Sequence, residues 1–205
     1  MIAMGDNHEM TFLELNKKVA TLLMLLTGKR VNSIHHYDVE FMKLSKMSCT
    51  FYQTVLLKHD RPGRFRSGSI VYKMYPHNAL LCPVTAIADL YVRRAQYDTA
   101  TTKLFIATTK PYGAACKNTV AGWIKKLLSS AGVNTKIYSA HSCRSAASSK
   151  ALDIGIPLQE ILSSCDWSSQ RTFHKHYKKE IEEAHECSEQ VYMGNTILDN
   201  VLLDR

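Results

Sequence analysis

The chain has 205 residues, of which 45% are hydrophobic and 21% are charged. These proportions are ordinary for a soluble globular protein and exclude a chain that is disordered along its whole length. Residues 1–10 lack the apolar core of a secretory signal, and the longest apolar stretch, residues 19–26, is too short to span a bilayer. We therefore expect one globular domain that is neither secreted nor bound to a membrane.

Positive charge is concentrated in the middle of the chain. The formal net charge is +8, and residues 58–126 hold twelve Lys and Arg against three Asp. A basic segment in an otherwise balanced chain favours a polyanion partner, because lysine and arginine neutralise phosphates; a solvated basic surface is the other interpretation. The six cysteines have no CxxC spacing, so we expect free thiols and no metal site of the zinc-knuckle type.

The first predicted elements are a helix and a small sheet. Apolar residues recur at helical spacing over residues 11–27, Thr11 and Glu14 predict a capping box, and Gly28 ends the helix. Strands are predicted over residues 39–44, 49–57 and 69–75. The connection at 58–68 is basic and is broken by proline and glycine, which indicates an antiparallel sheet with a polar loop.

From residue 83 onward the pattern is helical. Pro83 suits a first helical turn, Asn118 predicts an N-cap, and Gly132 and Gly155 predict helix ends. The helices are predicted over residues 83–96, 118–131, 139–153, 157–164 and 168–177, with a short extended piece at 104–107. We find no internal repeat, so the expected fold class is α+β, mostly α-helical, with a small antiparallel three-stranded sheet near the N-terminus.

Several residues have the chemistry of phosphate binding. Arg30 follows the first helix, and His141 and Arg144 lie three residues apart, so both side chains fall on one helix face and could share an anion. A helix-capping role for Arg30 and a chance HxxR pair are the alternatives. Tyr177 lies beside Lys175, His176, Lys178 and Lys179, which would favour its phenolate; otherwise it is a surface aromatic residue.

Taken in order, these residues resemble the catalytic domain of the tyrosine recombinase (phage integrase) family. The resemblance covers about residues 11–180 and looks closest to the eukaryotic transposon recombinases of the Crypton, Ngaro and DIRS type. The phrases LLCPVTAIADLY and HSCRSAASSKALDIGIPLQEILSSCDWSSQRTFHKHY carry much of it. The matching residues are Arg30 in a TGxR turn, Lys58 at a strand end, His141 and Arg144 in HxxR, Trp167 in DWSS, and Tyr177 in TFxxxY.

The resemblance implies an enzyme that cuts and rejoins DNA without metal, ATP or another cofactor. Tyr177 would attack the scissile phosphorus and form a 3′-phosphotyrosine, while Arg30 and Arg144 clamp the non-bridging oxygens. The other implied roles are general base for His141, protonation of the leaving 5′-oxygen for Lys58 or alternatively Lys73, and donation of an indole N–H to phosphate for Trp167.

The expected partner is double-stranded DNA, with self-association on DNA. Residues 1–180 would form the catalytic domain and residues 181–205 a tail that packs in cis or in trans, and the family's preceding core-binding domain is expected to be absent. The resemblance implies a role in mobile-element integration. It also implies location in the nucleus if the host is eukaryotic and in the cytoplasm otherwise. The expected DNA-binding residues are Arg61, Arg64, Arg66, Lys73, Lys175 and Lys178.

One departure from the family pattern leaves alternatives open. Ser33 occupies the position where the family usually has Glu or Asp, and a serine cannot supply charge. A DNA-binding module of the same fold without strand cleavage is therefore one alternative, and a type IB topoisomerase is another. A third is a zinc protein, whose ligands would be His174, His176, His185 and Cys187.

Overall fold

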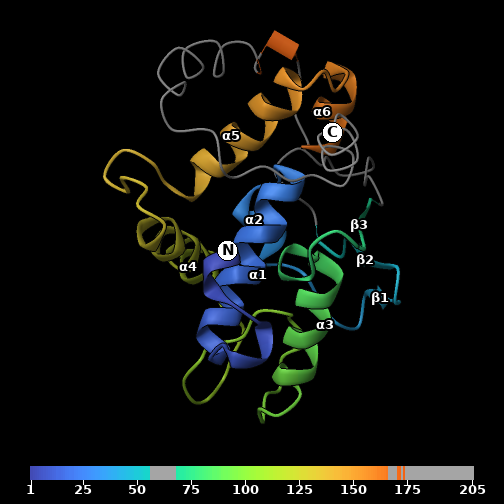
Figure 1. The fold of residues 1–205 in the computed structure, drawn as a ribbon. Helices are drawn as coiled ribbons and strands as arrows, with labels where there is room; N and C mark the ends of the chain where they lie inside the picture. The colour runs from blue at the N-terminus through green and yellow to red at the C-terminus, as the bar shows by residue number, and fades with distance from the viewer. Residues whose placement is uncertain (56–67, 166–169, 172, 174–205) are drawn as a thin grey trace.

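The computed structural model describes residues 1–55, 68–165, 170, 171 and 173. Within these residues, helices pack around one central helix and a three-stranded antiparallel sheet lies beside them (Figure 1). This confirms the predicted α+β fold class.

The central helix is α1 (Phe12–Thr27). Glu14 N donates to Thr11 Oγ1 at 3.2 Å and Thr11 N donates to Glu14 Oε2 at 2.8 Å, which confirms the predicted capping box. Twelve of its 16 residues are buried. It contacts α3 (Pro83–Arg94), α4 (Lys117–Ser130) and α5 (Ala140–Asp153). A helix buried on nearly every side is the core onto which the other elements pack.

The sheet has the order β1 (Met42–Leu44), β2 (Ser48–Tyr52), β3 (Ser69–Lys73). Its inner face is aromatic: the Phe51 ring stacks on Tyr37 with centroids 4.2 Å apart, and the Tyr37 and Tyr72 hydroxyls are 2.7 Å apart. All three strands are shorter than predicted. Val39 N donates to Thr102 O at 2.9 Å instead of extending β1, and β2 ends where its partner β3 begins.

The first residues fold back onto α1 and α3 through two 3₁₀ turns, η1 (Ile2–Met4) and η2 (Asn7–Glu9). The Lys18 side chain is fully buried; its Nζ donates to Asn7 Oδ1 at 2.6 Å, and Asn7 Nδ2 donates to Asp89 Oδ2 at 2.6 Å. Burial lowers the pKa of Lys18, while the charges of Asp6 and Asp89 oppose that shift. This polar network fastens the N-terminal segment to the core.

The predicted N-cap of helix α4, Asn118, is wrong. Its N-cap is Cys116, without a side-chain capping bond, so Asn118 lies inside the first turn. The Cys116 side chain contacts Thr119 Oγ1 at 3.3 Å, which holds the helix start one residue before the predicted one. The predicted ends are confirmed, since Gly132 and Gly155 adopt positive φ of 84° and 86° just after α4 and α5.

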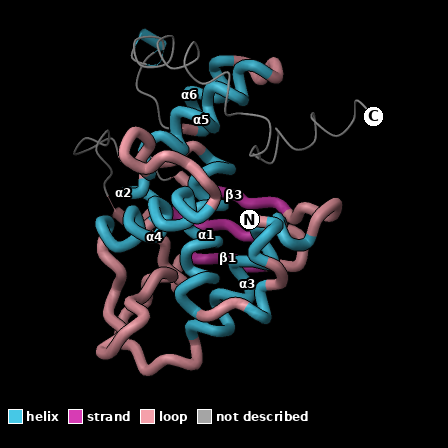
Figure 2. The backbone as a smooth tube through the Cα atoms, turned by 60° about the vertical axis from the view of Figure 1, so that its left-hand side comes forward, coloured by secondary structure: helices cyan, strands magenta, loops and turns pink. Residues whose placement is uncertain are grey.

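The last described elements form a second, smaller core. α6 (Leu158–Ser164) packs against α5, and Phe173 is buried in this core. η3 (Ala79–Leu81) precedes α3, and the predicted extended piece at 104–107 is reduced to isolated bridges, Asp38 with Lys103 and Ile106 with Ala114. Figure 2 shows the helices and strands of this arrangement from a second side. None of the described helices has the length and apolar character needed to cross a membrane.

Candidate active site

Arg30 lies in a tight turn between two helices. Gly28 ends α1 in the left-handed conformation, with φ 57° and ψ 16°, and its N–H donates to Met24 O at 2.9 Å. Arg30 is then the N-cap of a short helix that the sequence did not predict, α2 (Val31–Ile34). The turn therefore fixes the backbone of Arg30, whose side chain is half-buried.

Arg144 reaches this turn from α5. Its side chain is fully buried, and Nη1 donates to Gly28 O at 2.6 Å, across 116 positions of sequence. A guanidinium bound to a carbonyl is held in one orientation, because its donors form a rigid planar fork. The contact thus brings the second predicted phosphate-binding arginine to the turn that carries the first.

His141 lies one helical turn before Arg144, at the start of α5. Ser139 caps this helix by accepting a hydrogen bond from His141 N at 3.2 Å, and Ser142 Oγ accepts one from Ser139 N at 3.1 Å. The His141 side chain is exposed, whereas Arg144 is buried. The two residues share one end of a helix but differ in access to solvent.

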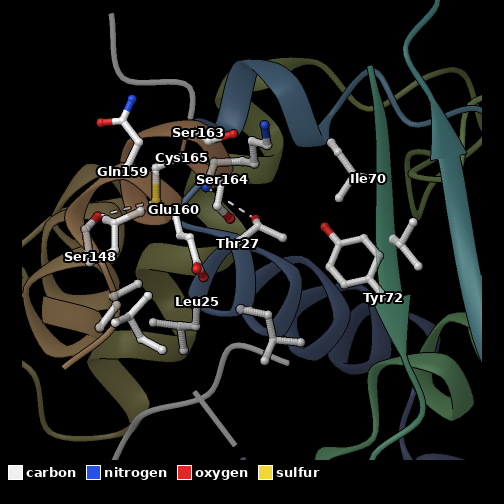
Figure 3. A pocket seen from close by; sticks show the side chains of 18 of the residues that line it. Leu25, Thr27, Ile70, Tyr72, Ser148, Gln159, Glu160, Ser163, Ser164 and Cys165 are labelled. Atoms are coloured by element: carbon white, nitrogen blue, oxygen red, sulfur yellow. Dashed lines mark hydrogen bonds between the residues drawn. The ribbon is translucent and has the colours of Figure 1, made fainter. Parts of the chain in front are cut away.

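A cavity of about 660 Å³ adjoins the Gly28 turn. It lies between the end of α1, strand β3 and helices α5 and α6 (Figure 3). Thr27 and Tyr72 line one part of it, and Ser148 and Cys165 line another, with Ser148 Oγ and Cys165 Sγ 3.6 Å apart. Its walls combine hydroxyl, thiol and apolar groups.

The part of the chain that the structure describes contains only some of the predicted site residues. Lys73 lies at the end of β3 with its side chain exposed. No group of His, Cys, Asp and Glu side chains among the described residues could hold a metal ion. The other predicted catalytic and DNA-binding residues lie outside the described residues, as does the alternative zinc set: Lys58, Arg61, Arg64, Arg66, Trp167, Lys175, Tyr177 and Lys178, and His174, His176, His185 and Cys187.

The fold is similar to those of solved recombinases. The XerH site-specific recombinase bound to its difH substrate, in a pre-cleavage complex, superposes with a TM-score of 0.61 at 15% identity, over 88% of this chain and 48% of that one. The chain has the fold of a tyrosine recombinase catalytic domain. A post-cleavage XerH complex with palindromic difH superposes with a TM-score of 0.60 at 15% identity, over 87% of this chain and 48% of that chain. The XerA recombinase superposes with a TM-score of 0.56 at 16% identity, over 87% of this chain and 64% of that chain.

The similarity to these recombinases lies in the fold. The chain spans about half the length of the XerH chains, 48% in each complex. No protein-family model matches the sequence, and no curated protein is a significant sequence match.

Within this recombinase fold, Ser33 faces an environment that the sequence did not indicate. Ser33 is 7% exposed and, together with His36 and Tyr37, lines a small cavity of about 20 Å³.

The rings of His35 and His36, which follow Ser33 in the chain, have their centroids 3.8 Å apart. Burial, with the nearby charges of His35 and Lys103, lowers the pKa of His36 to about 4. The sequence does not single out His36 as a site residue, because two adjacent histidines have no periodic pattern.

This lowered pKa predicts a loss of stability in mild acid. The unfolded chain binds a proton at His36 near pH 6.5 and the folded chain only near pH 4, so stability should fall as pH drops between these values. Because the ring is partly solvated, we expect the loss to be about 1 kcal/mol. Urea unfolding at pH 7.5 and pH 4.5 measures it. His36→Gln should reduce the difference without abolishing it, because burial also lowers the pKa of His35. An equal loss in both proteins would exclude His36 as a source.

Proposed function

We propose that this chain is the catalytic domain of a site-specific DNA recombinase that cuts and rejoins strands through Tyr177. The observation that carries the proposal is the buried contact from Arg144 Nη1 to Gly28 O at 2.6 Å, which joins the HxxR helix to the Arg30 turn in a recombinase fold. With Arg30 in that turn and Arg144 bound to it, the two arginines would provide what a phosphodiester requires, namely planar donors for its non-bridging oxygens.

The proposed reaction conserves the number of phosphodiester bonds. The Tyr177 oxygen attacks the scissile phosphorus, the bond from phosphorus to the 5′-oxygen breaks, and a 3′-phosphotyrosine and a 5′-hydroxyl result. His141 takes the phenolic proton, and Lys58 or Lys73 returns one to the leaving oxygen. Arg30 and Arg144 stabilise the negative charge that develops on the non-bridging oxygens of the pentacovalent phosphorus, and Trp167 donates its N–H to one of these oxygens; rejoining is the reverse. Because each ester bond replaces another, neither ATP nor a metal ion is needed.

The test is a covalent adduct that depends on Tyr177. Nicked duplexes with randomised sequence around the nick trap the intermediate, because the short 5′-hydroxyl strand diffuses away. Wild-type protein in EDTA should give a DNA adduct that resists SDS, and Tyr177→Phe should give none, since phenylalanine has no nucleophilic oxygen. Tyr91→Phe, on α3, is the matched control and should form adduct normally. An adduct that persists in Tyr177→Phe would remove this residue from the role.

The finer parts of the proposal rest on the sequence resemblance. We propose a mobile element of the Crypton, Ngaro or DIRS type as the source, with integration as the biological reaction and the nucleus as its place in a eukaryotic host. Double-stranded DNA is the proposed substrate, and protomers would associate on it, with residues 181–205 as the tail. Sedimentation with and without residues 184–205, in the presence of duplex DNA, tests the association.

Ser33 favours a second candidate, a DNA-binding module that does not cut. Its buried side chain supplies no charge beside the Arg30 turn, where the family usually has an acid. This candidate predicts binding to duplex DNA that weakens steeply with salt and no adduct from any sequence in the randomised pool. Recovery of a single cleaved sequence from the pool would exclude it.

A further inference from the structure

The solvent-facing side of the sheet has exposed aromatic and apolar residues that the proposed cleavage reaction does not use; of its residues, only Lys73 has a part in that reaction, as the alternative proton donor. In Figure 1 the strands lie at the right-hand margin, and the labelled helices lie to one side of them. Strand residues alternate, so those between the buried Cys49, Phe51 and Tyr72 face outward. We call these residues the outer sheet face: Phe41, Lys43, Thr50, Tyr52, Val71 and Lys73.

The register places aromatic and apolar side chains next to one another on the outer sheet face. Tyr52 N donates to Phe41 O at 2.9 Å, so these two residues are neighbours across the strand edge. Thr50 pairs with Lys43 on one side and with Val71 on the other. Phe41, Tyr52 and Val71 are 48%, 51% and 49% exposed, so each keeps about half its surface in solvent.

The charge of the outer sheet face is positive. Lys43 and Lys73 are exposed on its first and third strands, and Thr50 lies between the strands that carry them. None of the six residues is acidic; the nearest acid in sequence, Glu40, precedes Phe41 and is exposed. In the register the aromatic residues form one end row and the lysines occupy the next two rows. A surface with aromatic rings beside lysines complements a partner that has flat apolar groups along an anionic backbone.

We propose that the outer sheet face binds single-stranded DNA. Unpaired bases expose their faces and can stack on Phe41 and Tyr52, while the phosphates lie against Lys43 and Lys73. Duplex DNA hides those base faces inside its stack, so it can use only the lysines. An acidic peptide would satisfy the lysines but has no set of flat rings to match the aromatic pair. The binding goes beyond the proposed strand cleavage and does not depend on it.

The experiment compares how tightly single-stranded and double-stranded DNA bind to matched variants of the protein. Fluorescence anisotropy with a labelled oligothymidylate of about 20 nucleotides, which exceeds ordinary single-strand site sizes, gives the Kd. Tyr52→Ala should weaken binding about tenfold and Tyr52→Phe less than about twofold, because phenylalanine keeps the stacking ring. Tyr91→Ala removes a tyrosine that is 39% exposed on α3, and it should leave Kd unchanged. For a duplex of equal length, Tyr52→Ala should change the Kd by less than about twofold.

A second pair of variants tests the phosphate contacts. Lys43→Gln should reduce the salt dependence of oligothymidylate binding by about 0.7 in slope, the value for one phosphate of a single strand, and Lys43→Arg should retain it. The Tyr52 and Lys43 side chains are exposed, so thermal unfolding should match the wild type. Phe41→Ala provides an independent ring deletion, with about the same loss expected as for Tyr52→Ala.

Three results would overturn the proposal. Equal losses for single strand and duplex would reduce the outer sheet face to a general polyanion surface. Unchanged oligothymidylate binding in both Tyr52→Ala and Phe41→Ala would remove the stacking role. Self-association of the DNA-free wild type that Tyr52→Ala abolishes would make the face an interface between copies of this chain. All three are measured without an adduct, so they are separate from failure of the Tyr177 cleavage test.

Discussion

Replacing Gly28 with alanine should lower the free energy of unfolding by about 3 kcal/mol, because the new methyl group meets both backbone strain and a close neighbour. Gly28 has a φ of 57°, which side chains other than glycine adopt at a cost, and a Cβ there would lie 2.5 Å from Cys165 Sγ. Real Cβ atoms do not approach a sulfur so closely, so the α6 end or the Gly28 turn must move. Urea unfolding at neutral pH measures the change.

Two further variants separate strain from crowding. Gly132 has a φ of 84° and nothing within 4 Å of its would-be Cβ, so Gly132→Ala should cost only about 1 kcal/mol. The double variant Gly28→Ala/Cys165→Ala lacks the sulfur atom that the new methyl group would meet. Its loss of unfolding free energy should therefore be smaller than the sum of the two single-variant losses by about 1–2 kcal/mol. Equal losses for Gly28→Ala and Gly132→Ala would show that Cys165 does not crowd the turn.

The Gly28 turn also shows how far sequence patterns reach. The capping box of Thr11 and Glu14, and the helix ends at Gly28, Gly132 and Gly155, are local signals that the structure confirms. Apolar periodicity predicted α1, and an amphipathic pattern predicted α4, for the same reason, since a buried stripe depends on spacing within one element. What packs against Gly28 is not local: Cys165 lies far along the chain, and no spacing rule connects the two.

Most of the differences between prediction and structure involve partners that are distant in sequence. The network of Lys18, Asn7 and Asp89 joins three segments, and the sequence offers only a lysine on an apolar helix face. Val39 leaves the predicted strand because Thr102 provides a carbonyl for it, which again depends on the tertiary fold. Short helix α2 follows a turn and has no apolar period to detect. Partners distant in sequence therefore decided the first two of these differences, and α2 was missed because it is too short to show a period.

For the candidate site, sequence reasoning placed the residues in order but could not give their burial. The spacing of His141 and Arg144 predicts that both side chains lie on one helix face; both residues lie in the first turns of α5, yet one is exposed and the other fully buried. The burial of Arg144 follows from its contact with Gly28 O, which requires both α1 and α5 to be packed. A buried arginine bound to a turn carbonyl has a structural role as well as the proposed catalytic one, and the two can be separated.

Arg144→Lys should lower the cleavage rate by about 10²–10³-fold in single-turnover assays, because the ammonium group cannot place two planar donors on one phosphate. Its effect on stability should be smaller, about 1–2 kcal/mol, since the positive charge and much of the side-chain volume remain. Arg144→Ala removes the whole buried side chain and should cost about 3–5 kcal/mol. Urea unfolding and DNA affinity, measured beside cleavage, distinguish loss of chemistry from loss of the folded protein.

Arg94 is the matched control for Arg144. It is 8% exposed, and its side chain donates to Lys103 O at 2.7 Å and also to Thr101 O, so it too binds turn carbonyls from a helix. Arg94→Lys should destabilise the protein by a similar 1–2 kcal/mol, yet cleave at the wild-type rate under conditions where it is folded, about 25 °C and no denaturant. If Arg144→Lys behaves as Arg94→Lys does, then Arg144 supports only the turn, and the phosphate clamp must lie elsewhere.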